Sequence, residues 1–332
     1  MKRLRRFLQL PLAAGAVAFA VLSGFAVAVT GQDAWSQTAR TIKIIVPLAP
    51  GGGADILARL MADQISRAQS PTVVVENRVG AGSAIGSEAV SRAPPDGNTL
   101  LINTPNLIIG PYVRKLNYDA LKSFTPICHL VSSPALVVVN SASPYRVLDD
   151  LLGAARASPG ILTLASSGPA TTLHIAAEKL RQVANFNMIY VPYGGTAPAV
   201  TALLGEHVTA ALAEYPAVAE QLKAGTLRAL ATGSRTRIEP LPEVPTVAES
   251  GFRDYDVDLW WGVFAPAKTP KETVSQLAQL FTAALQAPGI KAKLAAAGFY
   301  PTGICGADFA AYMAKQSDEY GRVIREANIK AE

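Results

Sequence analysis

Two kinds of hydrophobic pattern alternate along the chain from Thr41 onward. Short apolar runs predict β-strands, and segments whose apolar residues recur every three to four positions predict amphipathic helices. This alternation is typical of an α/β fold with a largely parallel sheet. In the first part of the chain the predicted strands are IKIIVPL, TVVVEN, TLLIN and ALVVVN, with helices at about 55–69 and up to residue 90.

The pattern starts again after Asn140, with strands ILTLASS, MIYVPY, HVTAALAEY and TLRALATG and helices near 146–157, 171–183 and 197–204. Three later helices, near 269–286, 288–297 and 306–327, have too few strands of their own to form a domain. We therefore predict two lobes joined by crossings near 140 and 261. Ligands of such sheets bind at the carboxyl ends of strands, so we expect the ligand cleft between the lobes. The predicted lobes are 40–139 with 262–332, and 140–261.

The N-terminus has the pattern of a secretory signal peptide over residues 1–28. Four basic residues at 2–6 precede an uncharged run, and Ala-Val-Ala at 26–28 supplies a cleavage site. The alternative is an uncleaved membrane anchor, since residues 8–29 nearly reach the length that spans a bilayer. Pro11, Gly15 and Gly24 weaken such a helix, which favours cleavage and export.

Composition narrows the class of protein. A chain with 50% hydrophobic and 17% charged residues is globular, and its net charge of +5 falls to +1 when the four basic residues of the signal are removed. That balance argues against nucleic acid or an anionic membrane as partner. Cys128 and Cys305 either pair or stay as buried thiols. The histidines at 129, 174 and 207 lack metal-ligand spacing, so no metal is expected.

The loop at 47–55 carries three consecutive glycines between a strand and a helix. Glycines let backbone N–H groups approach a ligand, and a helix start favours an anion. No Lys-Ser/Thr pair follows, so the loop is not a P-loop. Asp55 is either the N-cap of the helix or a ligand contact, and the first reading is favoured.

A second glycine loop, GAGSAIG at 80–86, is similar to a dinucleotide fingerprint but has the spacing G-x-G-x-x-x-G. The next strand also ends in Asn103, where a ribose-binding acid is expected. We therefore predict close helix packing here, with Ser83 as the cap.

Hydroxyl-rich loops at 166–172 and 192–196 also join strands to helices. Ser167 lacks the G-x-S-x-G motif of a nucleophile, and His174 follows one helical turn along the same segment, a poor position for a base. The chain shows no paired carboxylates, Cys/His couple or metal cluster beside these loops. We predict a binding protein with no catalytic residue and no cofactor.

Several segments, in order, resemble those of the tripartite tricarboxylate transporter receptors, also called Bug solute-binding proteins. They are VPLAPGGGADILARLMA, VVVENRVGAGSAIGSEAV, APPDGNTLL, FTPI, ASSG, VPYGGTAPAV, LKAGTLRALA, EVPTVAESGF and WWGVFAPAKTP. The resemblance covers essentially the whole chain after the signal peptide.

This resemblance implies a two-lobed, type II periplasmic-binding-protein fold and a periplasmic receptor. A monomer is expected separately, because no exposed heptad or long apolar stripe indicates a dimer. The resemblance also implies a small carboxylate ligand and delivery to a membrane permease of one large and one small subunit. The ligand contacts that it implies are Leu48, Gly51, Gly52, Asp55, Ser83, Asn103, Ser166, Ser167, Thr171, Thr172, Tyr193, Gly195, Thr196 and Glu214.

The sequence departs from the family at Ala170, where glycine is frequent, at Gly194, where lysine is common, and at Tyr320, where tryptophan is usual. Glu214 would repel a second carboxylate or accept a hydrogen bond from an amide or ammonium group. Amino acids and aromatic acids such as nicotinate therefore stand beside di- and tricarboxylates as ligands. The alternative functions are a periplasmic sensor for a signalling partner and a hydrolase that uses Ser167.

Overall fold

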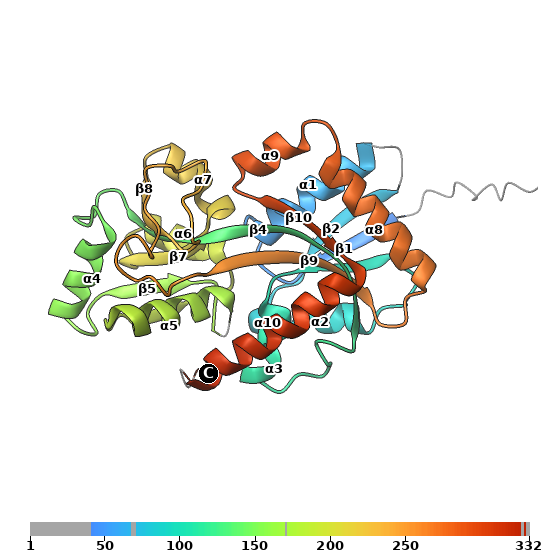
Figure 1. Cartoon of the computed structure of the whole chain (residues 1–332), viewed down its shortest axis with the longest axis horizontal. Helices are drawn as coiled ribbons and strands as arrows, with labels where there is room; N and C mark the ends of the chain where they lie inside the picture. Colours follow the sequence, from blue (N-terminus) through green and yellow to red (C-terminus); the bar gives the residue numbers. More distant parts are fainter. Residues whose placement is uncertain (1–40, 68–70, 170, 327–328, 330–332) are drawn as a thin grey trace, which may run out of the picture. The chain divides into compact units, whose positions relative to one another are not determined.

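The computed structural model describes residues 41–67, 71–169, 171–326 and 329. The predicted signal peptide and Ala170 lie outside these residues. Within the described ranges, the strands follow the hydrogen-bonded order β2-β1-β3-β9-β4-β7-β5-β6, and β8 and β10 also pair with β4 (Figure 1). Among the described helices, none has an apolar stretch of the length that crossing a membrane requires.

The first part of the chain forms three parallel strands with helices on both faces. β1 pairs with β2 and with β3. Ile44 of β1 packs in a cluster with Leu57 of the first helix, whereas Ile45 packs in another cluster with Val90 of the second. The elements are β1 (Thr41–Val46), α1 (Gly53–Arg67), β2 (Thr72–Asn77), a 3-10 turn (Ala81–Ser83), α2 (Ala84–Ser91), β3 (Thr99–Asn103) and α3 (Asn106–Val113).

The second part repeats this construction. β5 pairs in parallel with β6 and β7. Leu164 packs in a cluster with Leu173 of α5, and the next residue, Ala165, packs with Leu203 of α6. The elements are α4 (Leu148–Ala157), β5 (Thr163–Ser166), α5 (Thr172–Ala184), β6 (Ile189–Pro192), α6 (Thr196–Leu204), β7 (Ala210–Glu214), α7 (Tyr215–Lys223) and β8 (Leu227–Thr232).

Two long strands, β4 (Phe124–Asn140) and β9 (Asp258–Pro266), run side by side between these parts (Figure 1). β4 pairs with β9 as far as Pro134 and with β7 from Ala135, always antiparallel. The pairing of β3 with β9 is also antiparallel, and so are the pairings of β4 with β8 and with β10. The prediction of a largely parallel sheet is therefore wrong at the centre of the sheet, because apolar runs indicate strands but not the direction of distant partners.

The chain ends with α8 (Lys271–Gln286), α9 (Ile290–Ala296), β10 (Tyr300–Cys305) and α10 (Gly306–Glu326). These helices match the three predicted late helices, but the sequence did not predict β10. Cys128 of β4 and Cys305 of β10 form a disulfide, which settles the question that the sequence left open. Helix α8 packs on α1, and α10 packs on α3 and β4, so the late elements join the first part of the fold.

Candidate functional site

A small cavity lies where β1, β5 and β7 end and α1, α5 and α6 begin. Its volume of about 20 Å³ suits about one ordered water. Its lining residues are Leu48, Ala49, Gly52, Gly53, Ala54, Thr104, Asn106, Ser167, Thr172, Leu173, Thr196, Glu214, Leu259 and Trp261. Segments that are far apart in the sequence, from residue 48 to residue 261, therefore meet at one place.

The first loop is fixed by Asp55. Its Oδ2 accepts a hydrogen bond from the Gly51 backbone N–H at 3.0 Å, and Arg59 forms an ion pair with its Oδ1 at 2.9 Å. Burial raises the pKa of Asp55, but hydrogen bonds from Arg59, Gly51 and Asn77 outweigh burial, and the pKa lies below its usual range. The carboxylate is therefore a structural anion at neutral pH.

The favoured prediction that Asp55 is the N-cap is wrong. Helix α1 begins at Gly53, so Asp55 stands in its first turn and reaches back to the loop. Asp55 does not line the cavity, whereas Gly52 does.

Glu214 connects two of the predicted loops. Its Oε1 accepts a hydrogen bond from the Gly53 backbone N–H at 2.8 Å, and its Oε2 accepts one from the Thr196 hydroxyl at 2.6 Å. The side chain stands at the end of β7, and the residue is 5% exposed. Glu214 thus holds the start of α1 against the start of α6, and it is the only charged residue among those described as lining the cavity.

A second connection joins α3 to α5. Asn106 Oδ1 accepts hydrogen bonds from the Thr172 backbone N–H at 2.9 Å and from the Thr172 hydroxyl at 3.2 Å. Both residues are buried and both line the cavity. The first N–H of α5, which has no acceptor within its own helix, is satisfied in this way.

The serine loop contributes one hydroxyl directly to the cavity. Ser167 lines the cavity, and its Oγ donates to Thr171 Oγ1 at 3.2 Å. Thr171 is the N-cap of α5, since its Oγ1 accepts from the His174 backbone N–H. Ser166 bonds instead with the Tyr190 hydroxyl at 2.6 Å, and the Tyr190 ring stacks on the ring of His174.

Tyr193 and Gly195 shape the loop before α6 without lining the cavity. The Tyr193 backbone N–H donates to the carbonyl of Ser166. At Gly195, an added Cβ would lie 2.8 Å from the Cβ of Ala49, so only glycine lets the two loops approach this closely. At Gly194, an added Cβ would lie 3.9 Å from Cγ1 of Val79, which is an ordinary van der Waals contact.

Ser83 and Asn103 do not line the cavity and bond with each other instead. Asn103 Nδ2 donates to Ser83 Oγ at 3.3 Å and to Ser87 Oγ at 3.0 Å, while its Oδ1 accepts from the Thr104 backbone N–H. Ser83 occupies the N-cap position of α2, as predicted, but its side chain makes no capping bond. The packing prediction for this loop holds at Gly86, where an added Cβ would lie 2.7 Å from Pro47.

Six of the fourteen predicted residues therefore line the cavity: Leu48, Gly52, Ser167, Thr172, Thr196 and Glu214. The sequence interpretation missed Asn106, which follows the predicted strand TLLIN by only three positions. It also missed Trp261 as a site residue, although WWGVF was singled out as a motif. Polar residues that follow a predicted strand indicate a candidate ligand loop. Asn103 and Thr104 are such residues, and they could have pointed to Asn106 beside them.

The site combines backbone amides and hydroxyls from the starts of several helices. Such donors stabilise an anion through hydrogen bonds and the helix dipole. Burial raises the pKa of Tyr190, which keeps its hydroxyl protonated as a donor to the carbonyl of Gly168 at 2.7 Å. The arrangement supports binding of a small polar or anionic molecule.

Known proteins share this architecture. The family described as tripartite tricarboxylate transporter family receptor matches residues 57–329. BugT of Bordetella pertussis is 33% identical over 317 residues, which cover 94% of this chain and 96% of BugT. The periplasmic binding protein BugD is 29% identical with a TM-score of 0.84, covering 88% of this chain and 98% of BugD. The R. palustris protein Rpa4515, solved with adipate, is 30% identical with a TM-score of 0.85, covering 89% and 99%. The predicted resemblance and the predicted periplasmic-binding-protein fold are confirmed.

Proposed function

Because the chain belongs to the tripartite tricarboxylate transporter receptor family, we propose that it is a periplasmic receptor that captures a small carboxylate. It then delivers this ligand to a membrane permease of one large and one small subunit. The observation that carries the proposal is the wall of the cavity, where amide and hydroxyl groups gather at helix starts. The relative solved with adipate supports a carboxylate as the ligand.

In this proposal the ligand enters when two lobes separate. One lobe comprises 40–139 and 262–332, and the other comprises 140–261. A cavity of about 20 Å³ is far below the 300–1,000 Å³ of ordinary small-molecule sites. The bonds from Gly53 to Glu214 and from Thr172 to Asn106 join the two proposed lobes. These bonds must break or be replaced when a carboxylate enters, and β4 and β9 are the segments that bend.

Glu214 sets a condition on the ligand. A second carboxylate placed beside this buried acid would be repelled, whereas a hydroxyl, amide or ammonium group would find an acceptor. We therefore propose that the ligand carries a carboxylate toward the starts of α1, α5 and α6. Its class is a di- or tricarboxylate, an amino acid or an aromatic acid, and all fourteen predicted residues are retained as candidate contacts.

A thermal-shift screen of the purified protein tests this proposal. The protein is first unfolded and refolded to remove any trapped ligand, and is then mixed with mono-, di- and tricarboxylates, amino acids and nicotinate. A ligand at 100 times its dissociation constant stabilises the fold by about 2.7 kcal/mol. A clear shift with a carboxylate supports the proposal, and no shift with any member contradicts it.

A binding role without catalysis has its own test. The identified ligand is incubated with the protein and recovered, and we expect it unchanged. Product formation that disappears in the Ser167→Ala variant would instead establish a hydrolase. Thr201→Ala is the matched control, because the Thr201 hydroxyl donates to a carbonyl of its own helix and lies outside the cavity.

A further inference from the structure

The indole N–H of Trp261 is a buried donor without an acceptor. Trp261 is fully buried and lines the cavity of the candidate site, and its Nε1 makes no hydrogen bond with any residue that the structure describes. Buried indole N–H groups usually have a partner, because an unsatisfied buried donor is costly. Trp261 therefore indicates a place where a bound group accepts a hydrogen bond.

The N–H edge of this ring lies beside Glu214. A Cβ added to Gly53 would lie 2.8 Å from Cζ2 of Trp261 and 3.3 Å from Oε1 of Glu214. Cζ2 and Nε1 are bonded to the same ring carbon, so the edge of the indole that carries the N–H faces Gly53. Gly53, Trp261 and Glu214 all line the cavity. One small group in the cavity can therefore contact both side chains.

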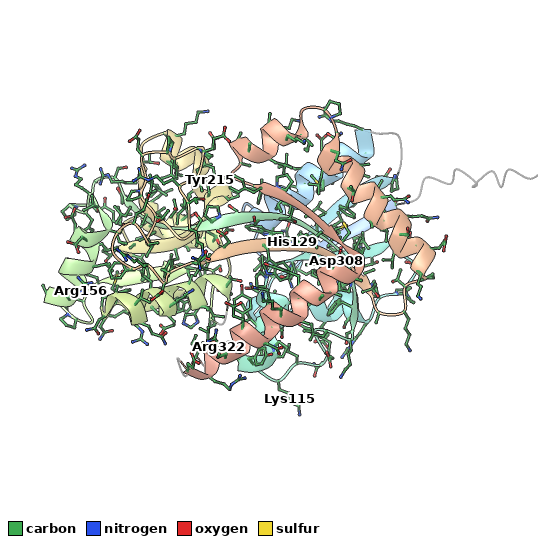
Figure 2. The ribbon with its side chains drawn as sticks, in the orientation of Figure 1. Lys115, His129, Arg156, Tyr215, Asp308 and Arg322 are labelled. Atoms are coloured by element: carbon green, nitrogen blue, oxygen red, sulfur yellow. A yellow bond between two sulfur atoms is a disulfide. The ribbon has the colours of Figure 1, made fainter. Side chains whose placement is uncertain are left out.

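Strand β9 directs Trp261, and not Trp260, to the cavity. Neighbouring side chains of a strand point to opposite faces, and Leu259 and Trp261 both line the cavity. Trp260 packs instead among aromatic rings, and its ring centroid lies 5.8 Å from that of His129, which Figure 2 labels. Trp260 is also buried, and its Nε1 has no partner among the described residues. The two tryptophans thus differ in their access to the cavity.

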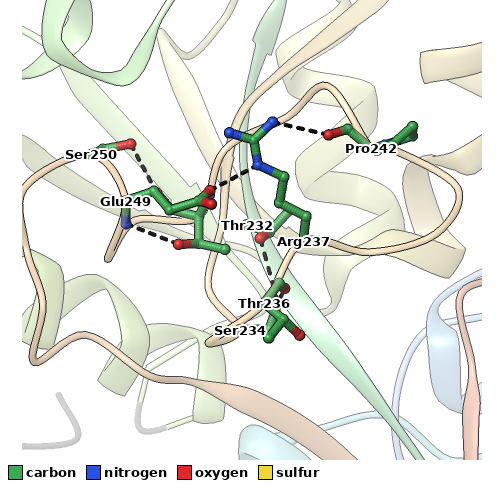
Figure 3. Close-up of polar contacts among 8 residues, drawn as sticks. Thr232, Ser234, Thr236, Arg237, Pro242, Glu249 and Ser250 are labelled. Carbon is green, nitrogen blue, oxygen red and sulfur yellow. Dashed lines mark hydrogen bonds and ion pairs between the residues drawn. The ribbon is translucent and has the colours of Figure 1, made fainter.

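Glu214 has no cation beside it in the cavity. It is the only charged residue among those described as lining the cavity. Arg237, an arginine of the second part of the fold, is held elsewhere. It pairs with Glu249 at 2.9 Å and donates to the carbonyl of Pro242 at 3.0 Å (Figure 3). A ligand carboxylate placed against Glu214 would therefore be repelled.

Trp261 and Glu214 together present one donor and several acceptor positions. The indole N–H only donates, whereas each Glu214 oxygen accepts one hydrogen bond and can accept another. A hydroxyl group matches both, because its oxygen accepts from Trp261 while its O–H donates to Glu214. An ammonium group would find an acceptor in Glu214, but it has no lone pair for Trp261. A carboxamide is larger than a cavity of about 20 Å³, which suits about one water-sized group.

We propose that Trp261 and Glu214 form a subsite for a hydroxyl group of the ligand, so that the receptor selects hydroxy acids. This inference rests on the proposed carboxylate-binding function and narrows its ligand class. The hydroxyl lies beside Gly53, and the remaining amide and hydroxyl donors of the wall bind the carboxylate.

Isothermal titration of the refolded protein with matched acids tests the proposal. Each set shares a carbon skeleton and carries hydrogen, hydroxyl or an amino group at carbon 2. The sets are propanoate, lactate and alanine; succinate, malate and aspartate; and glutarate, 2-hydroxyglutarate and glutamate. We expect the hydroxy acid of the set that binds best to bind roughly 5- to 100-fold more tightly than its two analogues, because only the hydroxyl satisfies both partners.

The outcomes separate this inference from the proposed function. Equal or tighter binding of the unsubstituted acid or the amino acid overturns the hydroxyl subsite and leaves the carboxylate receptor in place. A best ligand from the thermal-shift screen that lacks a hydroxyl group does the same. Absence of binding by every carboxylate contradicts the proposed function and this inference together.

Trp261→Phe removes the N–H and keeps an aromatic ring. The preference for the hydroxy acid over the unsubstituted acid should fall roughly 5-fold or more, while affinity for the unsubstituted acid changes little. Trp260→Phe is the matched control, because it removes a buried indole N–H outside the cavity, and the preference should remain.

Circular dichroism establishes that each variant is folded. If Trp261→Phe does not fold, the matched acids with the wild type decide the matter. An unchanged preference in the folded Trp261→Phe variant, or equal weakening of both acids, overturns the role of the indole N–H.

Discussion

Two buried polar residues, Glu214 and Asn106, connect helix starts that are distant in the sequence. Glu214 is an acid at a strand end in the sequence, but in the fold it accepts hydrogen bonds from both Gly53 and Thr196. Asn106 has the same role for Thr172. Asn106 Oδ1 accepts two hydrogen bonds, whereas each Glu214 oxygen accepts one and can accept another. A ligand that displaces these partners must supply donors in their place.

His129 has a different environment, which leads to a prediction about pH. The residue, labelled in Figure 2, is 3% exposed. Its ring lies against the rings of Phe309, Tyr312 and Trp260. Burial lowers the pKa of His129 from 6.5 to about 4. Between these values the unfolded chain binds more protons than the folded protein, so the free energy of unfolding falls as pH falls.

We expect His129→Phe to remove this pH dependence, because phenylalanine keeps an aromatic ring without a titratable group. Relative to the variant, the wild type should lose roughly 3 kcal/mol between pH 7 and pH 4. Urea unfolding of both proteins across this range measures the difference. Parallel pH profiles would show that His129 is not held in its neutral form.

At the scale of the element, the start of α1 depends on a residue without a side chain. An added Cβ at Gly53 would lie 2.8 Å from Cζ2 of Trp261 and 3.0 Å from Cγ of Glu214. Gly53→Ala should therefore force these buried groups apart and destabilise the protein by about 1–3 kcal/mol. It should also weaken binding of the carboxylate identified in the thermal-shift screen.

Gly153 of α4 is the matched control, because an added Cβ there meets nothing within 4 Å. Gly153→Ala should stabilise the protein by up to about 1 kcal/mol through its higher helix propensity. Urea unfolding of both variants distinguishes the signs. A neutral or stabilising Gly53→Ala would mean that the contact with Trp261 relaxes at little cost.

The sequence predicted those elements whose signals are local. Most α/β units of both parts were found, because each has an apolar strand, a turn and an amphipathic helix. Helix α3 escaped because its LIIG run is apolar throughout and Pro111 interrupts it. Strand β10 was not predicted because Pro301 and Gly303 weaken a strand pattern. Its partner strand, β4, is also distant in the sequence, so no local pattern indicates the pairing.

The candidate site was predicted unevenly for the same reason. Glycine and hydroxyl loops after strands are visible locally, and the family resemblance then pointed to Gly52, Ser167 and Thr196 within them. Trp261 and Leu259 enter the cavity only because β9 lies beside β4, which no local pattern indicates. The lobe boundaries remain a prediction.

At the scale of the whole molecule, the disulfide joins β4 to the C-terminal strand β10. Cys128 and Cys305 are separated by 177 residues, so the bond restricts a long loop of the unfolded chain. Replacing both cysteines by alanine should lower the free energy of unfolding by about 2–5 kcal/mol. Urea unfolding measures this loss, and reductant should destabilise the wild type but leave the double variant unchanged. Equal stability of the two proteins would contradict the prediction.

The closing motion proposed for the two lobes can be tested at Asn106. Besides the backbone pairing of β4, three polar side-chain contacts among the described residues join the proposed lobes: Gly53 with Glu214, Thr172 with Asn106, and Arg114 with the carbonyl of Pro169. Asn106→Ala leaves the N–H and hydroxyl of Thr172 without their acceptor in the closed form. Water satisfies both groups when the lobes separate, so the variant should favour the open form.

Small-angle X-ray scattering should therefore give a larger radius of gyration for the ligand-free variant than for the ligand-free wild type. Affinity for the carboxylate should fall roughly 5- to 30-fold, which corresponds to the loss of about 1–2 kcal/mol from unpaired buried donors. Asn117→Ala is the control, because the hydrogen bonds of the Asn117 amide within the described residues go to the partly exposed carboxylate of Glu88. A fall in affinity with an unchanged radius of gyration would limit Asn106 to local support of the site and would count against closure as the step that the ligand drives.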